Sequence, residues 1–252
     1  MLTVCSKTHP GKVREINEDC AVWDPEVSLI AVADGMGGHN AGEVASQLAL
    51  DTIRAFLKKS LSGDFTWPFG VKPTLSFAAN RLMTAIKIAN RRVNKASEQS
   101  ADYTGMGTTV AAAIVDGPRL AMCGVGDSRI YVFDASGLRQ LTTDHSWVVM
   151  LSKETGLPAS SFDNHPMRRV LTSVVGAGPD LEVTVDDIEL VDGATILFCS
   201  DGLHGALKDD EIAKILRAEP DLERAAEILV EQAVERDGSD NVTVALARYT
   251  PG

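Results

Sequence analysis

Three apolar runs in the sequence end in an aspartate. Each run has the composition of a buried strand, and the residues that close the runs are Val32-Ala-Asp34-Gly35, Val125-Gly-Asp127-Ser128 and Cys199-Ser-Asp201-Gly202. A fourth aspartate, Asp240, comes just before the apolar run from Val242 to Leu246. An ionised carboxylate in such surroundings costs on the order of several kcal/mol unless a positive group meets it. Because few Lys or Arg residues are adjacent, the fold must bring these strand ends to cations or to turns that they cap.

Clusters of carboxylate and carbonyl oxygens are the ligands that Mg²⁺ and Mn²⁺ prefer. The glycines that follow Asp34 and Asp201 allow a tight turn that brings a backbone carbonyl near a cation. No cysteine–histidine spacing typical of zinc sites is present. The residue types therefore indicate a hydrated divalent metal cluster, with turn capping as the alternative, since aspartate is also a common turn residue.

A second polar cluster occupies the expected connection between the first two strands. It reads Arg14-Glu-Ile-Asn17-Glu18-Asp19 and combines one guanidinium, suited to bidentate phosphate contact, with carboxylates that could hold metal-bound waters. A solvated charged loop is the simpler interpretation of such a run. An acidic site cannot attract phosphate alone, but two bound cations would invert its charge, and Arg14 would then complete an anion pocket.

The remaining pattern predicts a mixed α+β chain. Ala135-Ser-Gly137 and similar turns separate the segments, and 108–133 is expected to form an antiparallel meander. The helix over 75–97 should bury Phe77 and Leu82 and expose Arg81. No linker divides the chain, so we expect one domain, 1–252, with a short helix and a flap at about 146–178. The expected strands are 29–33, 108–115, 119–125, 129–133, 181–188, 194–199 and 241–249, and the expected helices are 40–59, with Asn40 as N-cap, 75–97, 209–217 and 222–235.

Composition excludes several classes of protein. Lys plus Arg is 24 against Asp plus Glu 35, a net charge of −11 that repels nucleic acid and anionic lipid. Aromatic residues make up only 5%, too few for a single-stranded nucleic-acid platform. No run approaches the roughly 18 apolar residues of a membrane span. The four cysteines are widely spaced, which is typical of a reduced, cytoplasmic protein.

Six segments, in order along the chain, make it resemble the metal-dependent protein serine/threonine phosphatases of type 2C, in their bacterial form. The resemblance covers nearly the whole chain, from residue 14 to residue 241, and implies an α-β-β-α sandwich in which helices flank two central antiparallel sheets. A two-metal site at one edge of the sheets is also implied. The segments are Arg14-x-x-Asn-Glu-Asp19, Asp34-Gly-Met-Gly-Gly-His39, Gly107-Thr-Thr109, Gly126-Asp-Ser128, Ser200-Asp-Gly202 and Asp240-Asn241.

The resemblance also implies roles for the aspartates at the strand ends. Asp34 would bridge two Mn²⁺ or Mg²⁺ ions, and the carbonyl of Gly35 would bind one of them. Asp201 and Asp240 would ligate the other ion. A water between the two ions would attack phosphorus in line, with no covalent phosphoenzyme.

Four further residues would complete this site. Glu18 and Asp19 would hold coordinated waters, and Asp127, together with Asp201, would support a third, weaker metal. Arg14 would hold the substrate phosphate and help to neutralise the equatorial oxygens.

The identity of the proton donor is less defined. Some family members carry a histidine two places after the bridging aspartate, but Met36 occupies that position here and His39 follows nearby. Serine alkoxide is a poor leaving group, so a proton donor is required. A metal-bound water is the first candidate and His39 the second, while packing of the loop or the helix start is the simpler role for His39.

Three functions are compatible with these residues. The first is a phosphatase that acts on phosphoserine and phosphothreonine in proteins and reverses a cognate Ser/Thr kinase. The second is a small-molecule phosphatase with the same metals, and the third is a catalytically silent regulatory module. Because Asp34, Asp201 and Asp240 are all present, the silent module is the weakest of the three. We expect a cytoplasmic monomer that binds phosphorylated proteins and neither nucleic acid nor membrane.

Overall fold

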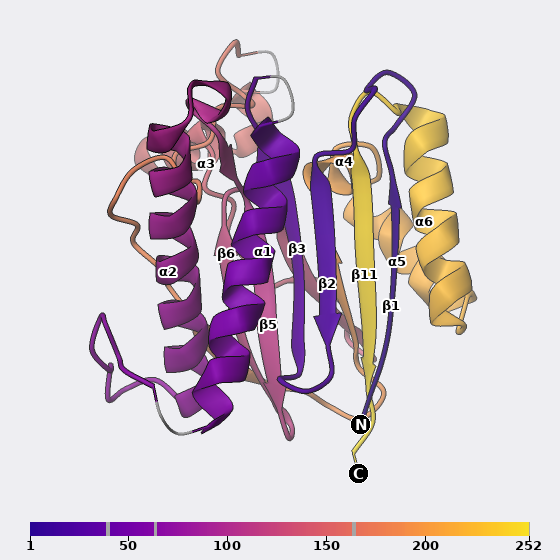
Figure 1. Ribbon diagram of the computed structural model, residues 1–252. Helices are drawn as coiled ribbons and strands as arrows, with labels where there is room; N and C mark the ends of the chain where they lie inside the picture. Colours follow the sequence, from indigo (N-terminus) through magenta and orange to yellow (C-terminus); the bar gives the residue numbers. More distant parts are fainter. Residues whose placement is uncertain (39–40, 63–64, 163–164, 252) are drawn as a thin grey trace.

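The structure is a computed structural model that describes residues 1–38, 41–62, 65–162 and 165–251. Two antiparallel sheets form its centre (Figure 1). One sheet has the strand order β1-β11-β10-β7-β8, and the other has the order β2-β3-β5-β6-β9, with β4 paired to β3. The strands are β1 (Leu2–His9), β2 (Asp19–Asp24), β3 (Leu29–Met36), β4 (Gly107–Thr108), β5 (Val110–Asp116), β6 (Arg119–Val125), β7 (Arg129–Asp134), β8 (Gly137–Gln140), β9 (Asp186–Glu189), β10 (Thr195–Cys199) and β11 (Val242–Tyr249).

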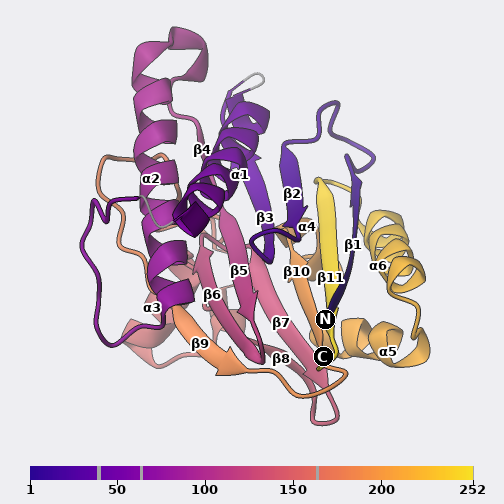
Figure 2. The ribbon, with the colours of Figure 1, turned by 60° about the horizontal axis from the view of Figure 1, so that its bottom comes forward.

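Helices cover the outer faces of both sheets. The pair α1 and α2 lies on the β2-β3-β5-β6 side, and α5 and α6 lie on the β1-β11 side (Figures 1 and 2). The predicted four-layer α-β-β-α sandwich is therefore confirmed. Among the described residues, no helix is long and apolar enough to cross a bilayer. The helices are α1 (Ala41–Lys59), α2 (Phe77–Gln99), α3 (Trp147–Thr155), α4 (Asp201–His204), α5 (Asp209–Ala218) and α6 (Leu222–Arg236), with 3₁₀ turns η1 (Ser60–Ser62), η2 (Ala101–Tyr103) and η3 (Ala159–Phe162).

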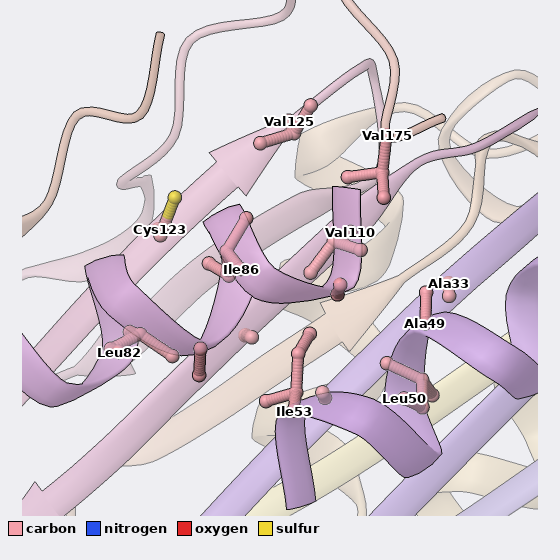
Figure 3. Packing of buried hydrophobic residues seen from close by; sticks show 14 of the residues in the cluster. Ala33, Ala49, Leu50, Ile53, Leu82, Ile86, Val110, Cys123, Val125 and Val175 are labelled. Carbon is pink, nitrogen blue, oxygen red and sulfur yellow. The ribbon is translucent and has the colours of Figure 1, made fainter. Parts of the chain in front are cut away.

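Both faces of the central strands are buried, which explains why these strands are apolar without alternation. In β3, Ala31 and Ala33 face the α1–α2 layer, while Ile30 and Val32 face the opposite sheet. Two hydrophobic cores therefore lie on either side of β3. Figure 3 shows the core between this sheet and the α1–α2 layer, in which Leu50 and other helix residues pack over the strands. A third core lies between the other sheet and α5–α6.

Two predictions for the helix after residue 75 were wrong. Phe77 is 60% exposed, whereas Arg81 is only 6% exposed. The Arg81 guanidinium lies against the end of α1, where Nε donates to Ser60 Oγ (2.7 Å) and Nη2 donates to the carbonyl of Leu57 (2.8 Å). Arg81 is buried because it satisfies the C-terminal groups of the preceding helix.

The expected meander was wrong at its third strand. β5 pairs with β6, but β7 crosses into the other sheet, where it pairs with β8 and β10. β9 begins only at Asp186, so most of the strand expected over 181–188 is irregular, and β3 extends beyond 33 to Met36. The short helix expected in 144–178 is α3. The proposed cap Asn40 lies outside the described residues, as does His39.

Candidate active site

The polar ends of several strands meet at one edge of the two sheets. β3, β6 and β10 end at this edge, while β2, β7 and β11 begin there. This edge is the upper end in Figure 1, where the start of β2 lies beside the start of β11. The antiparallel order therefore collects carboxylates that are far apart in the sequence.

Asp19 and Asp34 face each other across the β2–β3 pair. They are register partners in the ladder, so their Cβ atoms lie about 5 Å apart. Like charges in that position repel. Ser200 Oγ donates to Asp19 Oδ2 at 2.7 Å, which lowers the pKa of Asp19 by less than burial raises it. The second oxygen of Asp19, Oδ1, is buried with no hydrogen-bond partner among the described residues.

The backbone at Asp34 is held by two threonines. The Asp34 N–H donates to Thr109 Oγ1 at 2.9 Å, and its carbonyl accepts from Thr108 Oγ1 at 2.9 Å. Thr109 Oγ1 is also 2.6 Å from Ser128 Oγ, next to Asp127. A Cβ on Gly35 would lie 2.0 Å from the carbonyl oxygen of Gly42, so only glycine fits where β3 passes the start of α1.

Asn241 fixes the loop that carries Arg14 and Glu18. Its Nδ2 donates to the carbonyls of Pro10 (2.9 Å) and Ile16 (3.0 Å), and its Oδ1 accepts the Glu18 N–H at 2.8 Å. The Asn241 side chain is buried, so the loop is tied to the start of β11 by partners that solvent cannot replace. The loop 10–18 therefore has a defined position at the site.

Arg14 lies at the rim of the carboxylate group. Its Nη2 donates to Asp240 Oδ2 at 3.0 Å, and about half of its side chain is exposed. Partial burial lowers the pKa of Arg14, but the charges of Asp240 and Glu18 outweigh it and the net pKa is raised. The guanidinium is therefore charged and accessible to an anion from solvent.

The α4 turn places Asp201 against the others. A groove of about 360 Å³ passes between this turn, the flap and the 237–240 loop, and its lining includes Asp127, Asp201 and Asp240. His204 Nε2 lies 3.0 Å from the carbonyl of Asp127. Burial lowers the pKa of His204 to about 4, so the ring is neutral and its Nε2–H donates to that carbonyl.

Burial dominates the proton affinity of the carboxylates. It raises the pKa of Asp19 and of Asp127 to about 7, and it raises the pKa of Asp34 well above its ordinary value. The charges of Asp19 and Asp201 raise the pKa of Asp34 further. Burial also raises the pKa of Asp201, with Asp240 adding to the effect. These groups are thus unfavourable as anions unless cations lie between them.

The unpartnered oxygens test whether these residues fit divalent cations. Glu18 Oε1, Asp19 Oδ1 and Asp201 Oδ1 are buried without a hydrogen-bond partner in the described part of the chain, although such atoms are rare in folded proteins. Across residues 1–38, 41–62, 65–162 and 165–251, no three acidic, histidine or cysteine side chains enclose one point. An ion here would therefore keep waters and carbonyls in its shell, as Mg²⁺ commonly does. The oxygen-only donor set fits Mg²⁺ or Mn²⁺.

The structure brings all eight predicted site residues to this edge. The sequence analysis gave no role to Ser200, Asn241 or Thr109, which position those residues. Each lies inside a segment that carries the family resemblance, but its partners lie too far along the chain for the spacing to predict the contact. His39 lies outside the described residues.

A comparison with known protein families shows which family the chain belongs to. Residues 14–239 match the family described as Protein phosphatase 2C. The chain belongs to this family. The serine/threonine phosphatase stp of Listeria monocytogenes is 33% identical over 247 residues, which cover 95% of this chain and 93% of that protein.

Solved structures of serine/threonine phosphatases have the same fold as this chain over nearly its whole length. The crystal structure of the Mycobacterium tuberculosis serine/threonine phosphatase PstP/Ppp has a TM-score of 0.85 at 32% identity, covering 99% of each chain. The catalytic domain of PstP in complex with two manganese ions has a TM-score of 0.82 at 32% identity, covering 99% of this chain and 98% of that one. The predicted bacterial, metal-dependent protein serine/threonine phosphatase, with Mn²⁺ or Mg²⁺ as cofactor, is confirmed.

Proposed function

We propose that this protein phosphatase 2C enzyme hydrolyses phosphoserine and phosphothreonine at the carboxylate edge, with Arg14, Asp34 and Asp201 as its catalytic residues. The observation that carries this proposal is the set of three buried carboxylate oxygens, on Glu18, Asp19 and Asp201, that lack a hydrogen-bond partner among the described residues. When bound, two Mn²⁺ or Mg²⁺ ions supply a nucleophilic water at neutral pH and neutralise charge on the phosphoryl group.

The chain's own residues hold these ions in distinct ways. We assign Asp34 to bridge them, the carbonyl of Gly35 to bind one, and Asp201 and Asp240 to bind the other. The backbone at Asp34, fixed by Thr108 and Thr109, supports the bridging role because it holds this residue at the edge before any ion binds.

Glu18 and Asp19 hold water molecules around the ions. Their buried, unpartnered oxygens can accept hydrogen bonds from such waters, which removes the cost of leaving them unpaired. Asp127 supports a third, weaker ion with Asp201, because both line the same groove and the charge of Asp201 raises the pKa of Asp127.

Arg14 binds the substrate phosphate. Its exposed guanidinium lies against Asp240, at the entrance rather than inside the cluster, where a phosphate dianion can reach it. Met36 has no proton to donate to the leaving group, and the Nε2–H of His204 already donates to the Asp127 carbonyl. A water held at the carboxylates is therefore the proposed proton donor, with His39 as the second candidate.

The proposal also covers the domain organisation, the location and the partner of the enzyme. We propose a single phosphatase domain over 1–252 with a flap at about 146–178 that shapes access, and a cytoplasmic monomer that reverses a cognate Ser/Thr kinase. The flap is joined at its base, where the Trp147 N–H donates to the Val170 carbonyl at 2.8 Å and the Thr172 N–H donates to the His145 carbonyl at 2.8 Å. Ala159, Arg168 and Arg169 of the flap line the groove that holds Asp127 and Asp201, which supports a role in shaping access.

A metal titration of phosphopeptide turnover tests the function. Excess EDTA should abolish turnover, added Mn²⁺ should restore it, and phosphoserine and phosphothreonine peptides should be preferred over phosphotyrosine. Unchanged turnover in excess chelator would contradict the proposal. Turnover of small phosphate esters with no activity on phosphopeptides would instead favour a small-molecule phosphatase.

A further inference from the structure

An open groove of about 910 Å³ lies next to the active site, between the first half of α1 and the η2 turn. α1 and α2 run side by side, and η2 follows the end of α2, so the groove opens at the same end of the molecule as the carboxylates (Figure 1). We call it the α1 groove. Its described lining is Gly38, Ala41, Glu43, Val44, Gln47, Leu48, Asp51, Ala101, Asp102, Tyr103 and Thr104.

The helical period of α1 gives this groove an apolar floor and a polar rim. Ala41, Val44 and Leu48 recur at three- and four-residue spacing and form one row, and a second row begins at Glu43 and continues through Gln47 and Asp51. Val44 and Leu48 are only partly buried, although they pack against the core beneath the helices. They therefore remain available to an apolar side chain from another molecule.

The charged side chains in the described lining of the groove are all acidic. Glu43, Asp51 and Asp102 line the groove, and no lysine or arginine is among its described lining residues. Asp51 pairs with Arg54 at 2.8 Å, but neither Glu43 nor Asp102 forms an ion pair among the residues that the structure describes. The charge is complementary to a ligand that carries lysine or arginine.

The α1 groove adjoins the segment that leaves the catalytic edge. Gly38, which comes two residues after the end of β3 and four after Asp34, lines the groove at the start of α1. From Ala41 to Asp51 the helix rises about 15 Å, at 1.5 Å per residue. An extended peptide covers this length with about four residues, at roughly 3.4 Å each.

We propose that the α1 groove binds a basic segment of the phosphoprotein substrate, in which lysine or arginine residues flank an apolar residue. The segment lies about three to six positions from the phosphorylated residue, because the groove begins in the segment that follows Asp34 and spans about four residues of extended peptide. This inference rests on the proposed function and names the substrate class: phosphoproteins whose phosphosite is followed or preceded by such a segment.

Two probes separate the groove from the catalytic site. The first is a fluorescently labelled, unphosphorylated peptide with three lysines around a leucine, whose binding is measured by anisotropy. The second is p-nitrophenyl phosphate, which is too small to reach the groove. Asp102→Asn should weaken peptide binding about two- to fivefold at low salt, Asp102→Lys should weaken it more, and high salt should reduce all differences.

Matched controls keep the test specific. Asp210→Asn and Asp210→Lys change an exposed aspartate, also in the first turn of a helix, on the opposite outer layer, and they should leave peptide binding unchanged. Gln47→Lys adds a positive charge from the α1 side and should weaken peptide binding independently of η2. All variants should retain turnover of p-nitrophenyl phosphate, which also shows that they are folded.

The outcomes are distinguishable. Loss of binding with Asp102→Lys and Gln47→Lys but not with the Asp210 variants supports the inference, as does a matching rise in KM, at unchanged kcat, for a phosphopeptide that carries the lysines. Equal effects at Asp102 and Asp210, or none at either, would overturn it. Failure of the wild-type protein to hydrolyse p-nitrophenyl phosphate with Mn²⁺, while peptide binding persists, would refute the proposed function and leave the groove supported.

Discussion

Asp127→Asn should make the metal-free protein more stable, and the gain should grow with pH. Burial raises the pKa of Asp127 from 3.8 to about 7. Below pH 3.8 the carboxyl is protonated in both folded and unfolded chains, so it has no differential effect. Between pH 3.8 and pH 7 the unfolded chain ionises first, and stability is lost as pH rises. A shift of about three units corresponds to at most about 4 kcal/mol.

Urea unfolding in excess EDTA, from pH 4 to pH 8, measures this effect. The free energy of unfolding of the Asn variant minus that of wild type should be near zero at pH 4, increase with pH, and level off above pH 7. Exposed Asp210→Asn serves as the control and should show no such pH dependence. A difference that does not change with pH would refute the view that burial makes the Asp127 anion unfavourable.

Three further predictions concern single residues. Asp34→Asn should lower turnover of p-nitrophenyl phosphate at least about a hundredfold without lowering the melting temperature in EDTA. Arg14→Ala should raise KM for this substrate about tenfold and change kcat little, as steady-state kinetics will show. Asp144→Asn should lower the free energy of unfolding in urea by about 3 kcal/mol, because it leaves Arg129 unpaired, whereas Glu227→Gln at an exposed ion pair should change it little.

The sequence predicted the positions of the site aspartates near strand ends better than it predicted which strands pair. Each key aspartate lies near the end of a strand that is apolar on both faces, and such strands can lie only in the middle of a layered fold. Once Val32 and Val125 are placed in buried strands, Asp34 and Asp127 must lie at strand ends. The sequence cannot show which ends meet, and the crossing of β7 into the other sheet was missed because long-range pairing sets it.

Contacts between segments far apart in the sequence account for the other features that the sequence did not predict. Arg81 was expected to be exposed because it is charged, yet the carbonyl of Leu57, which it satisfies, lies 24 positions earlier. Asn241 binds the carbonyl of Pro10, 231 positions away, and no local pattern indicates that bond. Local sequence predicts which groups need partners, whereas the fold determines which partners they find.

Anomalous X-ray diffraction from crystals soaked in Mn²⁺ tests the central claim most directly. The account predicts at least two manganese peaks next to Asp34, Asp201 and Asp240, with the unpartnered oxygens of Glu18 and Asp19 turned toward waters around them. Well-ordered crystals in which these side chains point apart, with no manganese peak between them, would contradict it.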